Sequence, residues 1–126
     1  MQKKLIMIVD DEKQIIDLIK LSLGDEYEYM EAETGEETLL KVEQKIPDLI
    51  LLDIMMPGMD GYEVAKRLKN NPKTKNTVIA MVSAKKEDHD ILRGIDVGAV
   101  AFVTKPFNPM ELQEKVEELL QLTTPQ

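Results

Sequence analysis

The chain has 126 residues, of which 43% are hydrophobic and 32% charged, and its formal net charge is -8 at pH 7. This length suits one domain and is short for two. The absence of cysteine excludes a disulfide framework, a thiolate zinc site and a cysteine nucleophile. The acidic surplus argues against direct nucleic-acid binding by this domain, because neutralising phosphates requires a surplus of Lys and Arg.

The sequence also argues against a membrane or export segment. No apolar run approaches the roughly 18 residues of a membrane span. The N-terminal stretch MQKKLIMIVDD passes from lysines to acids without a cleavable apolar region. We therefore expect a cytoplasmic protein that does not bind membranes.

Strand-like runs alternate with helix-like segments five times, a pattern typical of a parallel sheet with helices on both faces. The first strand is predicted over Lys4–Val9. The helix that follows begins near Glu12, repeats its apolar residues at helical spacing and stops at Gly24.

The second strand is predicted over Tyr27–Ala32, where polar and apolar residues alternate as in a half-covered edge strand. The next segment starts at Thr34, and Glu37 stands three residues later, as in a capping box. This helix is expected to end before Pro47, because proline cannot continue a helix.

The middle of the chain repeats the same alternation. The third strand is predicted over Asp48–Leu52, and the helix after it begins near Gly61. This helix frays at the Asn-Asn-Pro stretch of residues 70–72. The fourth strand is predicted over Thr77–Val82, followed by a helix that runs to Gly98.

The fifth strand is predicted over Val100–Thr104, and the last helix has Asn108 as N-cap and Pro109 at its first position. The first, third and fourth strands are almost wholly apolar, so we expect them to be central and covered on both faces. Right-handed crossovers then make an α/β fold with a doubly wound parallel sheet the default architecture.

In such a sheet, functional residues gather at the carboxyl ends of the strands. The residues at these ends are Asp10 and Asp11 after the first strand, Asp53 after the third, Ser83 after the fourth, and Thr104, Lys105 and Pro106 after the fifth. Three carboxylates, one hydroxyl and one ammonium are therefore expected at one edge of the sheet.

This combination predicts chemistry on phosphate. Two unit charges about 4 Å apart repel by about 4 kcal/mol at an effective dielectric near 20, so the carboxylates need a cation. Mg²⁺ suits oxygen ligands and also accepts phosphate oxygens. Lys105 adds a fixed positive charge, and the hydroxyl of Ser83 can donate to a phosphoryl oxygen. Because an aspartate beside a metal and a lysine can attack phosphorus, Asp53 is the predicted acceptor.

Four motifs resemble the receiver domain of two-component response regulators. They are IVDDE, DIMMPGMDG, VSAK and FVTKPF, and they extend from the first strand to the last helix in the family's order. The resemblance implies a flavodoxin-like fold with strand order 2-1-3-4-5 and five helices. Residues 1–122 form the expected receiver domain, and residues 123–126 are a tail or the start of a linker.

The resemblance also implies a role for each site residue. Asp53 is the phosphorylated residue. Asp11, Asp53 and the backbone carbonyl of Met55 ligate Mg²⁺, and Asp10 acts mainly through a metal-bound water. Lys105 contacts the phosphoryl group.

Further positions follow from the same resemblance. Ser83 is the expected switch hydroxyl, and Phe102 is the switch aromatic that moves inward when Ser83 turns toward the phosphate. The bond between Lys105 and Pro106 is expected to be cis, and Gly61 allows its helix to begin close to the acceptor loop.

The implied function is a signalling switch rather than a turnover enzyme, with only self-phosphorylation and autodephosphorylation chemistry of its own. A histidine kinase or histidine phosphotransfer protein supplies the phosphoryl group. An effector protein or an output domain outside this sequence recognises the changed surface, and the sequence does not decide between these two possibilities.

Two departures from the family pattern affect these expectations. Val100 and Ala101 stand where many members have acids, which weakens the case for dimerisation through a charged helix-strand-helix face. Met55, two residues past the acceptor, is expected to limit the approach of water and to prolong the phosphorylated state.

Other interpretations stay open at this point. Asp10 and Asp11 can be a helix N-cap, Asp53 a turn acid and Lys105 a solvated lysine. Among functions, a Mg²⁺-dependent aspartyl-phosphate phosphatase lacks the second acid expected two residues after its nucleophile. A flavin or nucleotide module lacks a glycine-rich phosphate loop after the first strand. A degenerate receiver that works by docking alone is a further alternative.

Overall fold

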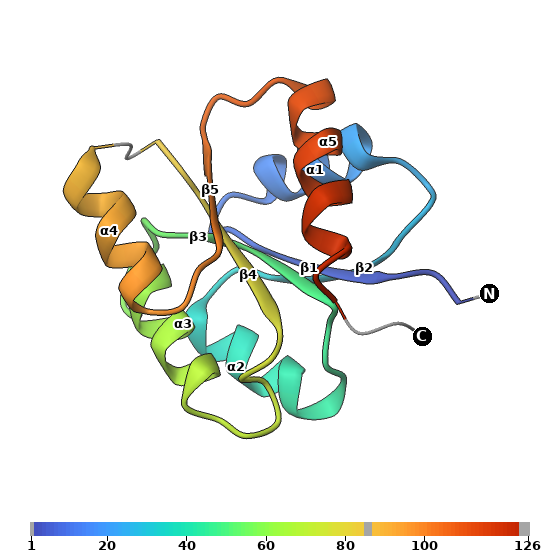
Figure 1. Cartoon of the computed structure of the whole chain (residues 1–126). Helices are drawn as coiled ribbons and strands as arrows, with labels where there is room; N and C mark the ends of the chain where they lie inside the picture. The colour runs from blue at the N-terminus through green and yellow to red at the C-terminus, as the bar shows by residue number, and fades with distance from the viewer. Residues whose placement is uncertain (1, 85–86, 124–126) are drawn as a thin grey trace.

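The five strands form one parallel sheet in the order β2-β1-β3-β4-β5, as expected (Figure 1). This computed structural model describes residues 2–84 and 87–123, apart from the side chains of residues 88 and 89. The strands are β1 Leu5–Val9, β2 Glu28–Ala32, β3 Leu49–Asp53, β4 Val78–Ser83 and β5 Ala101–Thr104. The predicted tail lies mostly outside the described residues, which end at residue 123.

Helices cover both faces of the sheet (Figure 1). The helices are α1 Lys13–Leu23, α2 Gly35–Gln44, α3 Gly61–Lys69, α4 Asp88–Asp96 and α5 Pro109–Leu120. The pair α1 and α5 lies on one face, and α2, α3 and α4 lie on the other. Within the described residues, no helix is long and apolar enough to cross a membrane. The predicted five helices and doubly wound sheet are therefore confirmed.

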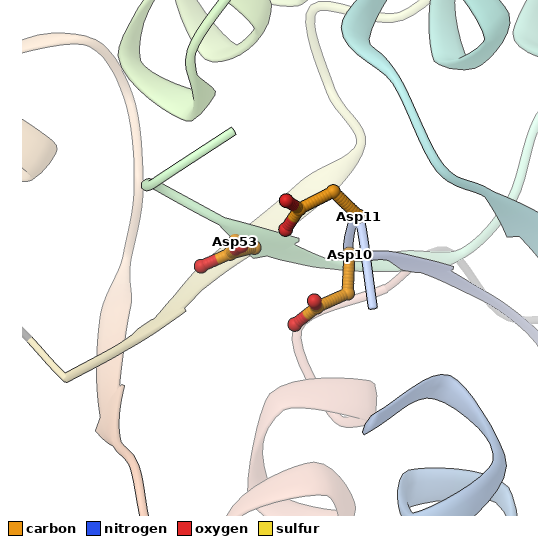
Figure 2. Close-up of side chains that lie close together, drawn as sticks. All are labelled: Asp10, Asp11 and Asp53. Carbon is orange, nitrogen blue, oxygen red and sulfur yellow. The ribbon is translucent and has the colours of Figure 1, made fainter. Parts of the chain in front are cut away.

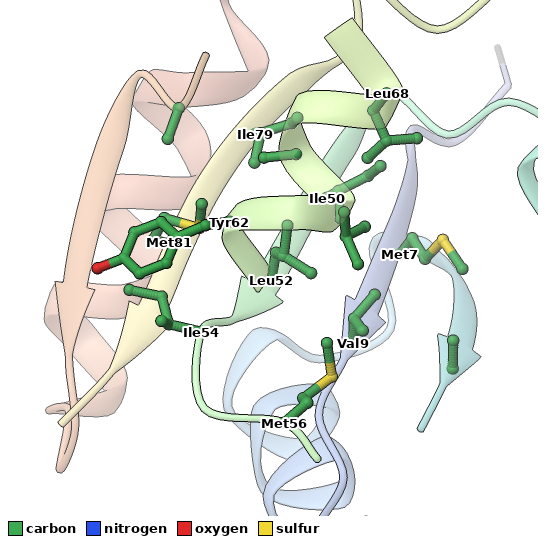
Figure 3. Close-up of a cluster of buried hydrophobic side chains, with 14 of the residues drawn as sticks. Met7, Val9, Ile50, Leu52, Ile54, Met56, Tyr62, Leu68, Ile79 and Met81 are labelled. Atoms are coloured by element: carbon green, nitrogen blue, oxygen red, sulfur yellow. The ribbon is translucent and has the colours of Figure 1, made fainter. Parts of the chain in front are cut away.

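The central strands are buried along their whole length. Every residue of β1, β3 and β4 is buried, whereas β2 and β5 are the edge strands and are only partly covered. One apolar cluster fills the space between the sheet and the α2–α3 layer (Figure 3). The other fills the space between the sheet and α1 with α5. The near-continuous apolar runs of the sequence correspond to this burial on both faces.

Strand β3 lies one residue further along the chain than predicted, and this shift concerns the site. Asp48 is outside the strand, and its carboxylate accepts a hydrogen bond of 2.8 Å from the backbone N–H of Leu5. Asp53 is inside the strand and pairs in register with Val82 of β4. The sheet ladder therefore fixes the backbone of Asp53 directly.

Two helices start with the side-chain N-caps that the sequence predicted. The Thr34 hydroxyl accepts from the backbone N–H of Glu37 at 3.0 Å. The carboxylate of Glu37 returns to the N–H of Glu33 and not to that of Thr34, so the predicted capping box is displaced by one residue. The Asn108 side chain caps α5, where Pro109 occupies the first position.

We expect Leu51→Ala to lower the free energy of unfolding by about 2–5 kcal/mol, because it leaves a cavity in the α1–α5 cluster. Leu51 is only 1% exposed. The matched control is Leu40→Ala, at a helix position that is 69% exposed, where the change should stay within about 0.5 kcal/mol. Urea denaturation of the two variants measures the difference, and equal losses would contradict this description of the core.

Candidate functional site

Three aspartates converge where β1 and β3 end. Val9 pairs with Leu52, so the residues that follow each of them leave adjacent strands at the same edge of the sheet. The carboxylates of Asp10, Asp11 and Asp53 each offer an oxygen atom, and these atoms all lie within 4.8 Å of one another. Figure 2 shows the three side chains side by side. The predicted convergence of these three acids is confirmed.

The three carboxylates differ in their environment. Asp10 is 1% exposed and Asp53 is 3% exposed, whereas Asp11 is exposed to solvent. Burying two acids side by side is costly unless positive charge or hydrogen bonds compensate. The site therefore depends on a cation that reaches it from elsewhere in the chain.

Lys105 provides that positive charge. Its Nζ lies 2.6 Å from Oδ2 of Asp10 and 3.5 Å from Oδ1 of Asp53. The residue follows β5, and its backbone N–H donates to the carbonyl of Ser83 at 2.9 Å, which anchors it beside the end of β4. The bond between Lys105 and Pro106 is cis, as the family resemblance implied.

Burial and charge shift the pKa values in this site. Burial, together with repulsion from Asp10, raises the pKa of Asp53 from 3.8 to about 6, although Lys105 and the N–H of Met55 oppose the shift. Burial by itself would lower the pKa of Lys105, but hydrogen bonds to and attraction by Asp10 and Asp53 outweigh it and raise the pKa. Three carboxylates thus face one ammonium, and oxygen ligands with excess negative charge suit a hard divalent cation such as Mg²⁺.

Ser83 and Phe102 lie on neighbouring strands, but only Ser83 reaches the edge that carries the acids. Ser83 is the last residue of β4, is 1% exposed and pairs with Thr104. Phe102 lies two residues earlier on β5, is half-buried and packs against the α2–α3 cluster. Its ring also lines a cavity of about 90 Å³ next to α4.

The structure corrects two of the alternative interpretations. Glu12, not Asp10 or Asp11, is the N-cap of α1, and Oδ1 of Asp10 accepts from the N–H of Glu12 at 2.9 Å. Lys105 is not a solvated lysine, because its side chain is 17% exposed and forms ion pairs with two acids. Asp53 does accept from the N–H of Met55 at 3.3 Å, so a turn role coexists with its place in the site.

Gly61 allows α3 to begin against the acceptor strand, as implied. A Cβ atom at this position would lie 2.3 Å from the carbonyl oxygen of Asp53 and 2.8 Å from the Cα of Ile54. The cap of this helix, which was not predicted, is Asp60, whose Oδ1 accepts from the N–H of Glu63 at 3.0 Å. The Asp-x-x-Glu spacing was the available signal for that cap.

Comparison with known proteins decides the family. Residues 6–117 match the family described as the response regulator receiver domain. The chain is a response regulator receiver domain. Receiver domains are signalling switches of two-component systems, so the match groups the chain with switches and not with turnover phosphatases or flavin modules.

Curated relatives of this receiver domain include transcriptional regulators. It is 42% identical over 123 residues to the phosphate regulon transcriptional regulatory protein PhoB of Pseudomonas aeruginosa, covering 97% of this chain and 54% of that protein. It is 41% identical to the alkaline phosphatase synthesis transcriptional regulatory protein PhoP of Bacillus subtilis, covering 95% of this chain and 49% of that protein. The receiver domain thus spans about half the length of these relatives.

Solved structures agree on the fold. A putative response regulator from Chloroflexus aurantiacus superposes with a TM-score of 0.90 at 34% identity, covering 95% of this chain and 99% of that one. The chemotaxis protein CheY4 of Vibrio cholerae superposes with a TM-score of 0.88 at 30% identity, covering 93% and 98% respectively. The flavodoxin-like arrangement implied by the motifs is therefore confirmed.

We expect Asp53→Asn to stabilise the metal-free protein at pH 8 by about 2–3 kcal/mol. Because the folded state raises the pKa of Asp53 from 3.8 to about 6, its ionised form costs stability above pH 6. This cost declines as the pH falls through about 6 and is absent below the unfolded value, so the two proteins should converge near pH 4. Urea denaturation with a chelator across this range measures the gap, and a gap that widens on acidification would contradict the assignment.

Proposed function

We propose that this receiver domain is a phosphorylation-activated switch and that Asp53 accepts the phosphoryl group. The observation that supports this most strongly is the placement of Asp53 at the end of a central strand, with Lys105 and two further carboxylates beside it. The family and its transcriptional relatives are consistent with such a switch. The donor is a histidine kinase or a histidine phosphotransfer protein.

The acidic cluster fits Mg²⁺. Asp10, Asp11 and Asp53 present oxygen atoms within 4.8 Å of one another, and one ammonium leaves part of their charge unbalanced. Asp11, Asp53 and the backbone carbonyl of Met55 would hold the ion directly, with Asp10 in a supporting position. When bound, Mg²⁺ supplies the positive charge that neutralises phosphoryl oxygens.

The protein would contribute mainly by positioning the reacting groups and neutralising charge. A carboxylate oxygen of Asp53 attacks phosphorus, the phosphorus–nitrogen bond of the donor breaks, and the leaving imidazole nitrogen takes a proton from solvent. Lys105 neutralises charge on the transferred group. Attack of water on the acyl phosphate releases inorganic phosphate and restores the Asp53 carboxylate, which resets the switch.

The response to phosphorylation would begin at Ser83. Its hydroxyl is placed at the same edge as Asp53 and can donate to a phosphoryl oxygen, and Phe102 is the aromatic that would follow it inward. Val100, which directly precedes β5, is 54% exposed and apolar, whereas many receivers have an acid at this position. An effector protein or an output domain attached to residues 1–122 would read the changed surface.

Acetyl phosphate and Mg²⁺ should produce one phosphoryl adduct, detected as an intact-mass increase. We expect the adduct to disappear in Asp53→Asn and when the metal is chelated, because both the nucleophile and charge neutralisation are required. Asp17→Asn is the matched control, since this α1 acid has a side chain that is 61% exposed, and it should still form the adduct. Binding of Mg²⁺ without any adduct would instead support a degenerate receiver that acts by docking alone.

Met55→Asn should shorten the lifetime of the phosphorylated state several-fold. Met55 is 56% exposed, and its backbone N–H donates to Oδ1 of Asp53 at 3.3 Å. We expect its bulky side chain, this close to the acceptor in the chain, to limit the approach of water to the acyl phosphate. Met55→Leu keeps that bulk and should decay at the parent rate. Decay of the mass adduct after removal of the donor measures both variants, and a Met55→Asn rate no faster than that of the parent would exclude this shielding role.

A further inference from the structure

Helix α4 has very little apolar anchoring. Among its described residues other than 88 and 89, only Asp90 and Gly94 are buried, while Leu92 is 61% and Ile95 is 58% exposed. None of the described α4 residues belongs to either buried apolar cluster. Displacing a helix with few buried apolar contacts costs little free energy, because the hydrophobic stabilisation that holds the other helices is small here.

The seam between α4 and β5 is also incompletely filled. A cavity of about 90 Å³ lies there, large enough for more than one water molecule. It is lined by Ile91, Gly94, Ile95, Ala99, Val100, Ala101 and Phe102. Gly94 lies close to the sheet, where a Cβ atom would be 3.4 Å from Cγ of Met81, but the space around it is not closely packed.

Tyr62 of α3 provides the contacts that packing does not. Its hydroxyl donates to the backbone carbonyl of Asp90 at 3.2 Å and lies 3.5 Å from Oδ1 of the same residue. The guanidinium of Arg93 stands over the Tyr62 ring, 4.1 Å from its centroid. These contacts join the first turn of α4 and the turn after it to a single side chain.

Tyr62 is itself rigidly held. It is 3% exposed and belongs to the α2–α3 cluster, where Figure 3 shows it near Ile54 and Met81 with its hydroxyl oxygen pointing away from the other labelled side chains. Burial and the nearby carboxylate of Asp90 raise the pKa of the Tyr62 hydroxyl, which keeps it protonated as a donor. Its ring thus anchors one end of the link in the core.

The other end of this link reaches the acceptor strand. Tyr62 directly follows Gly61, whose N–H donates to the carbonyl of Ile54 at 3.0 Å and where a Cβ atom would clash with the carbonyl oxygen of Asp53. A shift of the Ile54 backbone, just after β3, would therefore move the start of α3, and with it the ring of Tyr62.

We propose that Tyr62 is a positioning residue whose hydroxyl latches α4 to α3, so that movement of the Ile54 backbone, just after β3, is passed to α4. The latch provides a second route of transmission in addition to the Ser83 hydroxyl. It responds to the position of the backbone rather than to the phosphoryl group itself. The nature of the movement at Asp53 rests on the proposed function, whereas the latch between α3 and α4 does not.

Tyr62→Phe tests the latch because it keeps the ring and the Arg93 contact but removes the hydroxyl. We expect amide hydrogen exchange in residues 88–96 of the unphosphorylated protein to become about two- to tenfold faster, the effect of losing one neutral hydrogen bond. Exchange in β1 and β3 should remain unchanged. The matched control is Tyr29→Phe, which removes a hydroxyl that donates to the Gly24 carbonyl at 2.6 Å, far from α4 in the sheet order.

Exchange in α4 that is the same in Tyr62→Phe as in the parent would overturn the proposal, as would equal acceleration in Tyr29→Phe. A second arm compares both proteins after treatment with acetyl phosphate and Mg²⁺, with the adduct confirmed by mass. The parent should show a larger change in α4 exchange than Tyr62→Phe, and equal changes would overturn the role in transmission. If the parent forms no adduct, the proposed function fails while the unphosphorylated comparison still decides the latch.

Discussion

The repulsion between buried carboxylates at the ends of two central strands is the constraint on which this receiver domain depends. Asp10 and Asp53 leave adjacent strands and are almost fully buried, so neither can relieve its charge by turning into solvent. Lys105 compensates for part of it, but the ammonium lies closer to Asp10 than to Asp53. The acceptor keeps a raised pKa and the pocket keeps an excess of negative charge, a combination suited to a divalent cation and a phosphoryl group.

The rest of the fold fixes the backbone around this charged edge and leaves other parts loosely held. The ladder with β4 holds Asp53, and Gly61 brings α3 into contact with it. Helix α4 has the opposite character, since few of its described residues are buried and it contacts Tyr62 through polar groups beside a cavity. A rigid acceptor next to a weakly anchored helix is the arrangement that a switch needs, because a small bias can then favour a second position.

Much of the site could be read from local patterns. The two-residue period of the strands and the 3.6-residue period of the helices predicted the alternation, and parallel strands then require that their carboxyl ends share an edge. These patterns predicted that Asp10, Asp11 and Asp53 lie together. The Asp60 cap was not predicted, and the alternative in which Asp10 or Asp11 caps α1 was wrong, because adjacent polar residues at a helix start are distinguished by backbone conformation.

The sequence by itself determined the fold class, the residue types at each strand end and, through its motifs, the family. Only the tertiary structure decided how Lys105 divides its contacts between two acids, one of them 95 residues away in the chain. It also decided that the Tyr62 hydroxyl reaches Asp90, 28 residues later. Such contacts depend on how separate helices and strands pack, and periodicity within a segment carries no information about the distance between side chains on different segments.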